Sequence, residues 1–183
     1  MPEIRFVKVT ETSPDIEKLE ELYESAFPPE ERPAPMRDFI AVSERYDFLS
    51  VDEILLDGAF CGFTVYADGE QWNYGLLFAI KDSERSKGYG SIAFKAFLES
   101  QKDKIHMGVI EKPVSSAPNY EQRIRRRAFY ERLGMYISDI EIKDGDSEYL
   151  LIASRQDDDL ETYFHQYMAR ATALEEEFRK NGQ

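Results

Sequence analysis

The stretch KDSERSKGYGSIAFKAF, residues 81–97, places two glycines one residue apart at the start of an apolar segment. Arg85 and Lys87 stand just before Gly88 and Gly90. A glycine turn lets successive backbone N–H groups converge, and the dipole of a helix that begins there adds partial positive charge. The stretch therefore predicts a binding turn for phosphate oxygens, with a plain glycine turn before a helix as the alternative.

Two common phosphate-binding patterns compete for this stretch. The Walker pattern is excluded, because it needs Lys and Ser or Thr directly after the second glycine and Gly90 is followed by Ser-Ile. The dinucleotide pattern G-x-G-x-x-A is matched by Gly88, Gly90 and Ala93. It is disfavoured because that pattern turns directly off its first strand, whereas KDSERS intervenes here, and because the strands before it are predicted to be antiparallel.

The hydrophobic pattern predicts the elements around this stretch. Apolar runs predict strands at 4–9, 47–56, 59–67, 71–80, 104–110, 135–143 and 147–154. Asp-Gly pairs at 57–58, 68–69 and 144–145 predict hairpins. We expect an α/β protein of the α+β type, with a mixed and mostly antiparallel central sheet of about seven strands flanked by helices.

Helices are expected between these strands. Ser13 as N-cap and Pro14 at the first helical position predict a helix start, and the proline-rich loop at 28–35 separates that helix from one near 36–45. Residues 88–101 are apolar around most of the helical wheel, which predicts a largely buried helix. A further helix is expected at 120–134.

The C-terminal region carries a helical seam, formed by Leu160, Phe164, Tyr167, Ala171, Leu174 and Phe178. We expect this seam to dock on its own domain, with a homodimer contact as the alternative. The length of 183 residues predicts one domain, residues 1–155, followed by a C-terminal helical extension, residues 156–183.

Composition excludes several function classes. A formal net charge of −13 argues against nucleic acid and anionic membranes as partners. Cys61 stands alone, and His106 and His165 lack ligand spacing, so no disulfide and no metal site is predicted. The N-terminal segment has neither the apolar run of a signal peptide nor the length of a membrane span, so a cytoplasmic protein is expected.

Two motifs together resemble one family. RSKGYG, residues 85–90, resembles motif A of the GCN5-related N-acetyltransferases (GNAT superfamily), whose pattern is Q/R-x-x-G-x-G/A. AFYERLGM, residues 128–135, resembles the FYxxxGF segment of motif B, with Met135 in place of Phe. The order of expected strands and helices also resembles the GNAT fold. The resemblance implies an N-acetyltransferase that moves an acetyl group from acetyl-CoA, its cosubstrate, to a primary amine of a small molecule or peptide by direct attack.

The resemblance also implies roles for individual residues. Phe78, Ala79 and Ile80 would pair with the pantetheine arm, and a backbone N–H near Phe78 would polarise the acetyl carbonyl. The pyrophosphate would be bound by the loop and the helix start, namely Arg85, Ser86, Lys87, Gly88, Tyr89, Gly90 and Ser91.

Acid and base roles follow from the same resemblance. Tyr130 occupies the position of the general acid that protonates the departing thiolate. Tyr74 occupies the strand position where some members have a Glu, and a tyrosine cannot serve as an ordinary carboxylate base. Glu111 is the substitute expected as base, with Glu70 or water as alternatives. The missing Glu leaves a noncatalytic acyl-CoA-binding module as the alternative function.

Overall fold

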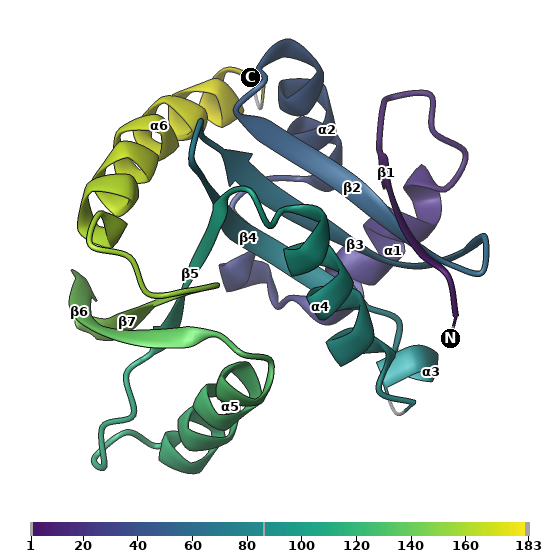
Figure 1. The fold of residues 1–183 in the computed structure, drawn as a ribbon. Coiled ribbons are helices and arrows are strands. Elements are labelled where there is room, and N and C mark those ends of the chain that lie inside the picture. The colour runs from purple at the N-terminus through teal and green to yellow at the C-terminus, as the bar shows by residue number, and fades with distance from the viewer. Residues whose placement is uncertain (1, 86, 182–183) are drawn as a thin grey trace.

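The fold is a seven-stranded sheet with helices on both faces (Figure 1). The computed structural model describes residues 2–85 and 87–181. The strands are β1 (Ile4–Lys8), β2 (Leu49–Leu56), β3 (Ala59–Asp68), β4 (Trp72–Ile80), β5 (Ile105–Glu111), β6 (Tyr136–Asp144) and β7 (Ser147–Ala153). Their order across the sheet is β1-β2-β3-β4-β5-β7-β6, so the predicted mixed and mostly antiparallel sheet is confirmed.

The pairing of β4 with β5 differs from the rest of the sheet. It is parallel, whereas the other described strand pairs are antiparallel. It is also short, with the three register pairs Trp72–Ile105, Asn73–His106 and Tyr74–Met107. A mostly antiparallel sheet excludes the doubly wound architecture that the dinucleotide alternative requires.

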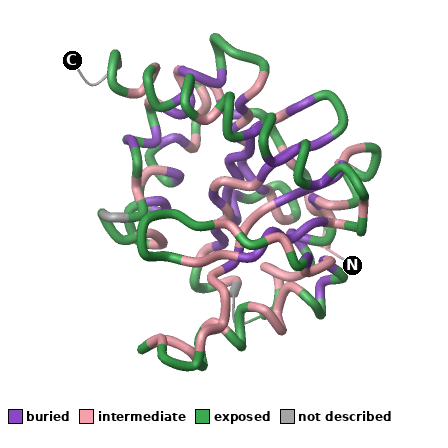
Figure 2. Tube along the Cα trace, turned by 90° about the vertical axis from the view of Figure 1, so that its left-hand side faces the viewer, coloured by how far each residue is buried: buried purple, intermediate pink, exposed green. Residues whose placement is uncertain are grey.

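The helices form two layers. They are α1 (Ile16–Ala26), the 3₁₀ turn η1 (Pro29–Glu31), α2 (Met36–Arg45), α3 (Asp82–Arg85), α4 (Tyr89–Ser100), α5 (Tyr120–Arg132) and α6 (Leu160–Asn181). One apolar cluster joins α1, α2 and the end of α6 to one face of the sheet. Two others join α4 and the end of α5 to the opposite face. Figure 2 shows that buried residues are concentrated along the central strands between these layers.

Two predictions for the helices are wrong in detail. Asp15, not Ser13, is the N-cap of α1, because the hydroxyl of Ser13 instead accepts a hydrogen bond from the Thr10 N–H at 2.9 Å and closes the preceding turn. In α4, the buried residues are Ala93, Phe94 and Phe97. The helix lies on the outside of the sheet and buries only the face that packs against it. Its other face is exposed to solvent, so the helix as a whole is not largely buried.

The C-terminal helix packs on its own chain. Tyr167 stacks on Tyr74 of β4, with ring centroids 3.7 Å apart and an angle of 12° between the planes. Farther along α6, Phe178 meets Phe39 of α2 at 4.7 Å. The seam is therefore occupied by β4 and α2 of the same chain.

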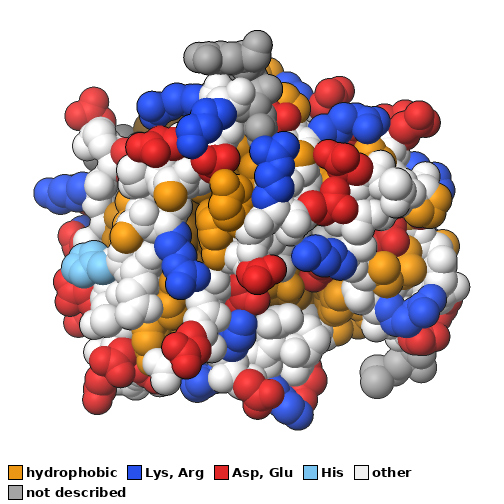
Figure 3. Space-filling model, turned by 90° about the horizontal axis from the view of Figure 1, so that it is seen from above, with side chains coloured by type: hydrophobic (Ala, Val, Ile, Leu, Met, Phe, Trp, Pro, Cys, Tyr) orange, Lys and Arg blue, Asp and Glu red, His pale blue; other side chains and the backbone are white. Residues whose placement is uncertain are grey.

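The molecular surface mixes charges of both signs. On the face seen in Figure 3, acidic and basic side chains are interspersed over the surface. Elsewhere on the molecule, charged side chains form local ion pairs, such as Lys102–Glu99 and Arg127–Glu131. In the part of the chain that the structure describes, no helix combines the length and apolar character needed to cross a bilayer.

Candidate functional site

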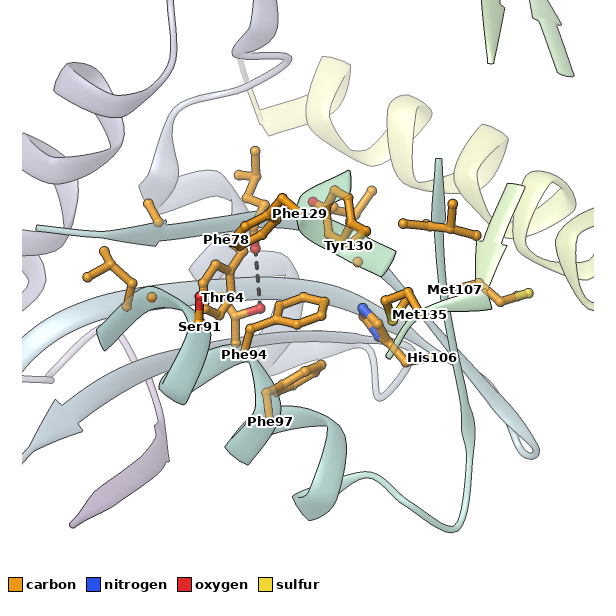
Figure 4. A pocket seen from close by; sticks show the side chains of 18 of the residues that line it. Thr64, Phe78, Ser91, Phe94, Phe97, His106, Met107, Phe129, Tyr130 and Met135 are labelled. Atoms are coloured by element: carbon orange, nitrogen blue, oxygen red, sulfur yellow. Dashed lines mark hydrogen bonds between the residues drawn. The ribbon is translucent and has the colours of Figure 1, made fainter. Parts of the chain in front are cut away.

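A cavity opens where β4 and β5 separate. Beyond the Tyr74–Met107 pair the two strands no longer share a ladder, and β4 contains a bulge opposite Val65 and Tyr66 of β3. The cavity between them has a volume of about 550 Å³. Residues 75–80 and 106–109 line its strand walls, and α4 and α5 contribute Phe94 and Tyr130 (Figure 4). We call this space the fork cavity.

The inner edge of β4 presents backbone groups to the fork cavity. The Lys81 N–H donates to the Cys61 carbonyl at 2.9 Å, and the register runs without interruption from Gly62–Ile80 to Val65–Leu77. Because bonded and non-bonded pairs alternate in an antiparallel ladder, the N–H and C=O of Phe78 point away from β3 and toward β5. An extended ligand can therefore hydrogen-bond to β4 as an additional strand would.

Side chains support this geometry. The Thr64 hydroxyl donates to the Leu77 carbonyl at 3.2 Å (dashed in Figure 4), so the carbonyl that faces β3 is satisfied. Phe78, Ala79 and Ile80, which the sequence predicted as ligand-binding, all line the cavity.

The outer end of the fork cavity lies at the start of α4. Gly88, at φ +79°, takes the left-handed conformation that other residues adopt only with strain. The Ile92 N–H donates to the Gly88 carbonyl, so the N–H groups of Tyr89, Gly90 and Ser91 have no partner within the helix. These donors and the helix dipole give the turn the geometry that anion binding requires, and its binding of phosphate stays a prediction.

The structure describes only part of the loop that carries the basic residues Arg85 and Lys87. Lys87 forms an ion pair with Glu84 at 3.2 Å, on the exposed side of the turn. Neither Lys87 nor Tyr89 is among the residues that line the fork cavity, whereas Gly88, Gly90 and Ser91 are. Ser86 and the side chain of Arg85 lie outside what the structure describes.

Tyr130 lies on the wall of the fork cavity formed by α5. Its ring meets Phe94 edge to face at 5.8 Å and Phe129 at 5.4 Å. Burial raises the pKa of the Tyr130 phenol, against an opposing effect of Arg126. The hydroxyl therefore keeps its proton at neutral pH and can donate it.

Glu111 does not join Tyr130. Its carboxylate is held by Arg123 at 3.2 Å and by Arg126 at 3.1 Å, both on α5, and it is not among the residues that line the fork cavity. The structure brings no support to Glu111 as a base. Through these ion pairs Glu111 joins the end of β5 to α5. No residue of α5, all of which the structure describes, is fully buried.

Tyr74 occupies the position on β4 at which the resemblance described above would place a glutamate. It is buried under Tyr167 and Phe164 of α6, and burial is the largest cause that raises its phenol pKa. It does not line the fork cavity.

His106 is a site residue that sequence reasoning missed. It lies on β5 at the inner end of the fork cavity and is 6% exposed. Burial lowers the pKa of its imidazole to about 4. The sequence carried one signal, a single polar residue inside the apolar strand IHMGVI, but its partner Asn73 stands 33 positions away on β4.

Comparisons with known proteins address the fold. No protein-family model and no curated protein gives a significant match. Among solved structures, the chain is similar to an acetyltransferase assigned to the GNAT family from Bacteroides thetaiotaomicron, with 26% identity and a TM-score of 0.74 over 88% of this chain and 94% of that one.

Two further similar structures contain coenzyme A. One is an aminoglycoside 6'-N-acetyltransferase, 14% identical, with a TM-score of 0.59 over 84% of this chain and 99% of that one. The other is an acetyltransferase from Bacillus subtilis, 14% identical, with a TM-score of 0.54 over 85% and 99%. At such identities these two likenesses show the fold alone. With the strand order, the fork between β4 and β5 and the likeness over nearly the whole of both chains, the chain belongs to the GNAT superfamily of acetyltransferases.

Proposed function

We propose that this protein transfers an acetyl group from acetyl-CoA to a primary amine by direct attack of the amine on the thioester. The observation that carries the proposal is the fork cavity, with an inner edge of β4 on one side and, at its outer end, the first N–H groups of α4, which have no partner within the helix. Membership of the GNAT superfamily supports acyl-CoA-dependent acetyl transfer in general. The donor and the acceptor are our inference.

The residues present fit acetyl-CoA. The N–H groups of Tyr89, Gly90 and Ser91 would bind the pyrophosphate, and the backbone of Phe78 would pair with the pantetheine arm. The apolar walls suit an acyl chain, since Phe94, Phe97 and Met107 lie along the route inward from α4. Acetyl-CoA would supply an activated acetyl group there, and an N–H of β4 would polarise its carbonyl.

Tyr130 would act as general acid. Its phenol is protonated at neutral pH because burial raises its pKa, and it lines the cavity in which the thioester would bind. Proton transfer of this kind contributes roughly 10² to 10⁴ in rate.

The acceptor would enter beside the loop between α1 and α2. Phe27, which directly precedes this loop, lines the fork cavity. The loop segment PPEERPAP carries two glutamates and one arginine, and the chain as a whole has a net charge of −13. This charge favours a cationic amine in its approach.

A noncatalytic acyl-CoA-binding module is the second candidate. It is favoured by Tyr74, which replaces the strand carboxylate and is covered by Tyr167. Such a module would bind acetyl-CoA in the same cavity and release no thiol.

Two experiments separate these candidates. A thermal-shift assay with acetyl-CoA, CoA and NAD comes first: a ligand at 100 times its dissociation constant adds about 2.7 kcal/mol of stability. Thiol release from acetyl-CoA is then followed with an aminoglycoside, a polyamine, an aromatic monoamine and a short peptide with a free N-terminus. Absence of a response to acetyl-CoA and to CoA contradicts both candidates. Binding without thiol release favours the noncatalytic module.

A further inference from the structure

The inner end of the fork cavity is closed by the imidazole of His106. The ring extends from β5 across to β4, where it lies over Gly75: a Cβ at residue 75 would be 3.0 Å from Cε1 and 3.2 Å from Nε2 of His106. Phe94 and Phe97 of α4 pack edge to face on the ring at 5.8 and 5.1 Å (Figure 4). The imidazole is thus held in one position where the two strands separate.

Hydrogen bonds fix the tautomer of this ring. The Asn73 amide nitrogen donates to the side-chain oxygen of Gln101 at 3.4 Å, which turns the amide oxygen of Asn73 toward His106. That oxygen lies 2.5 Å from Nδ1, so Nδ1 carries the hydrogen. The lone pair is then on Nε2, for which the described part of the chain offers no hydrogen-bond donor.

The lining of the fork cavity leaves few groups that can exchange a proton. Among its described residues, the titratable side chains are His106 and Tyr130, and neither Asp nor Glu contributes. The ring of Phe94 packs on both, with a centroid distance of 5.8 Å to each, so one aromatic ring links the two groups. Because Tyr130 keeps its proton, His106 is the side chain there that is ready to accept one.

We propose that His106 is a catalytic residue, the general base that takes the proton from the attacking amine. This role rests on the proposed acetyl transfer. The amine nitrogen forms a bond to the carbonyl carbon of the thioester, and its proton passes to Nε2 of His106. The carbon–sulfur bond breaks with its electron pair on sulfur, and the sulfur takes the phenolic proton of Tyr130. Return of one proton from His106 to Tyr130 through solvent restores both groups, and the products are the amide and the CoA thiol.

The low basicity of the buried ring is compatible with this role. Burial lowers the pKa of His106 to about 4, so Nε2 remains an acceptor throughout the neutral range. The nitrogen of an attacking amine becomes strongly acidic as its bond to carbon forms, and a weak base then suffices. Among the described residues, Asn73 on β4 is the polar side chain bonded to the ring, and it is bonded in turn to Gln101. The titratable groups against the ring's aromatic neighbours are Tyr66 on β3, with its partner Asp52 on β2, and Tyr130 on α5.

The test compares full-length variants in the thiol-release assay, with acetyl-CoA and the most reactive amine of the panel above. His106→Ala should lower kcat/KM for the amine by roughly 10²-fold or more while the acetyl-CoA thermal shift persists. Added imidazole should restore part of the rate. Substituted imidazoles of higher pKa should restore more, and pyrazole, a ring of similar shape and much lower basicity, should restore little. A full rate in His106→Ala, or equal rescue by pyrazole, overturns the proposal.

A second variant keeps the test decisive if His106→Ala does not fold. Asn73→Asp places a carboxylate against the Nδ1–H and should raise the pKa of His106, so the acidic limb of the kcat/KM profile should move to higher pH. A limb that stays in place in a folded, active Asn73→Asp variant contradicts the proposal. Absence of thiol release by the wild-type protein contradicts the proposed function itself, whereas an active wild type with unaffected His106 variants contradicts only the role of His106.

Discussion

Gly75 and His106 are in such close contact that a Cβ on residue 75 would lie 3.0 Å from the imidazole. Residue 75 directly follows the last residue of β4 that pairs with β5, and the contact stands at the closed end of the fork cavity. A Cβ at this position would be too close to the ring, so the imidazole would have to shift by a few tenths of an ångström. Because Gly75 on β4 has no side chain, the imidazole of His106 on β5 has room at the closed end of the fork cavity.

This buried imidazole should make stability depend on pH. The pKa of His106 is lowered from 6.5 to about 4, so between these values the unfolded chain binds a proton that the folded protein does not. Stability should therefore fall as pH decreases below 6.5, by about 3 kcal/mol in total. Urea unfolding near pH 7 and near pH 5 measures about 2 kcal/mol of this loss, which His106→Gln should reduce. Burial raises the pKa of Asp52 and of Glu53, which acts in the opposite direction but is common to both proteins. Equal pH dependence of the two proteins would contradict the prediction.

Tyr130→Phe should slow turnover and preserve binding. The variant keeps the ring that packs on Phe94 and loses only the proton donor. We expect kcat to fall roughly 10² to 10⁴-fold. The thermal shift with acetyl-CoA should remain, and it serves as the control for folding. An unchanged kcat would remove Tyr130 from the role of acid.

Glu84→Gln should tighten the binding of acetyl-CoA. Glu84 holds Lys87 in an ion pair and places a negative charge beside the anion-binding turn. Its removal frees Lys87 for a phosphate, and we expect a dissociation constant about 2- to 5-fold lower at low salt, with less effect at high salt. The matched control is Glu99→Gln, which breaks the similarly spaced pair with Lys102 at the other end of α4. Equal effects of the two substitutions in calorimetric titrations would contradict a local role of Lys87.

Gly88 and Gly90 should differ in their tolerance of alanine. Gly88 has φ +79°, and Gly88→Ala should cost about 1 kcal/mol of folding stability. At Gly90 a Cβ would have Ile80 Cγ1 at 3.9 Å as its nearest neighbour, an ordinary contact, so Gly90→Ala should leave stability unchanged or slightly raised. Urea unfolding of the two variants tests the contrast, and equal losses would contradict it.

Glu111 should act through α5. Glu111→Gln removes ion pairs to Arg123 and Arg126 and should lower the free energy of unfolding. In a double-mutant cycle with Arg123→Gln, we expect a coupling of about 1 kcal/mol, because both substitutions break one contact. The same cycle on kcat tests the base assignment made from sequence. If Glu111→Gln lowers kcat by the same factor in the wild-type and in the Arg123→Gln background, the result would support Glu111 as the base.

The sequence predicted the local elements and the turns between them. The Asp57-Gly58 pair predicted a hairpin, and both residues take positive φ in the turn between β2 and β3. The spacing of Gly88 and Gly90 before an apolar run predicted a glycine turn before a helix, and α4 begins there with Gly88 at φ +79°. These features depend on residues that are neighbours in the sequence, so they can be recognised from a short stretch of chain.

Other parts of the site depend on contacts between distant segments. The expectation of a buried α4 failed because periodicity reports which residues are apolar but not how many layers cover a helix. The Glu111 assignment came from its place at the end of β5, and its partners on α5 became known only with the fold. The stack of Tyr167 on Tyr74 joins the C-terminal helix to the central strand.

By itself, the sequence determined the strand and helix order, the glycine turn at the start of α4 and the position of Tyr130, because each is encoded by local spacing and backbone preference. The tertiary structure alone decided which side chains share the fork cavity. It brought Asn73 and Gly75 of β4 to His106 of β5 and turned Glu111 toward the arginines of α5. The physical reason is that strand register and the packing of helices on the sheet set these distances, and no short stretch of sequence contains both partners.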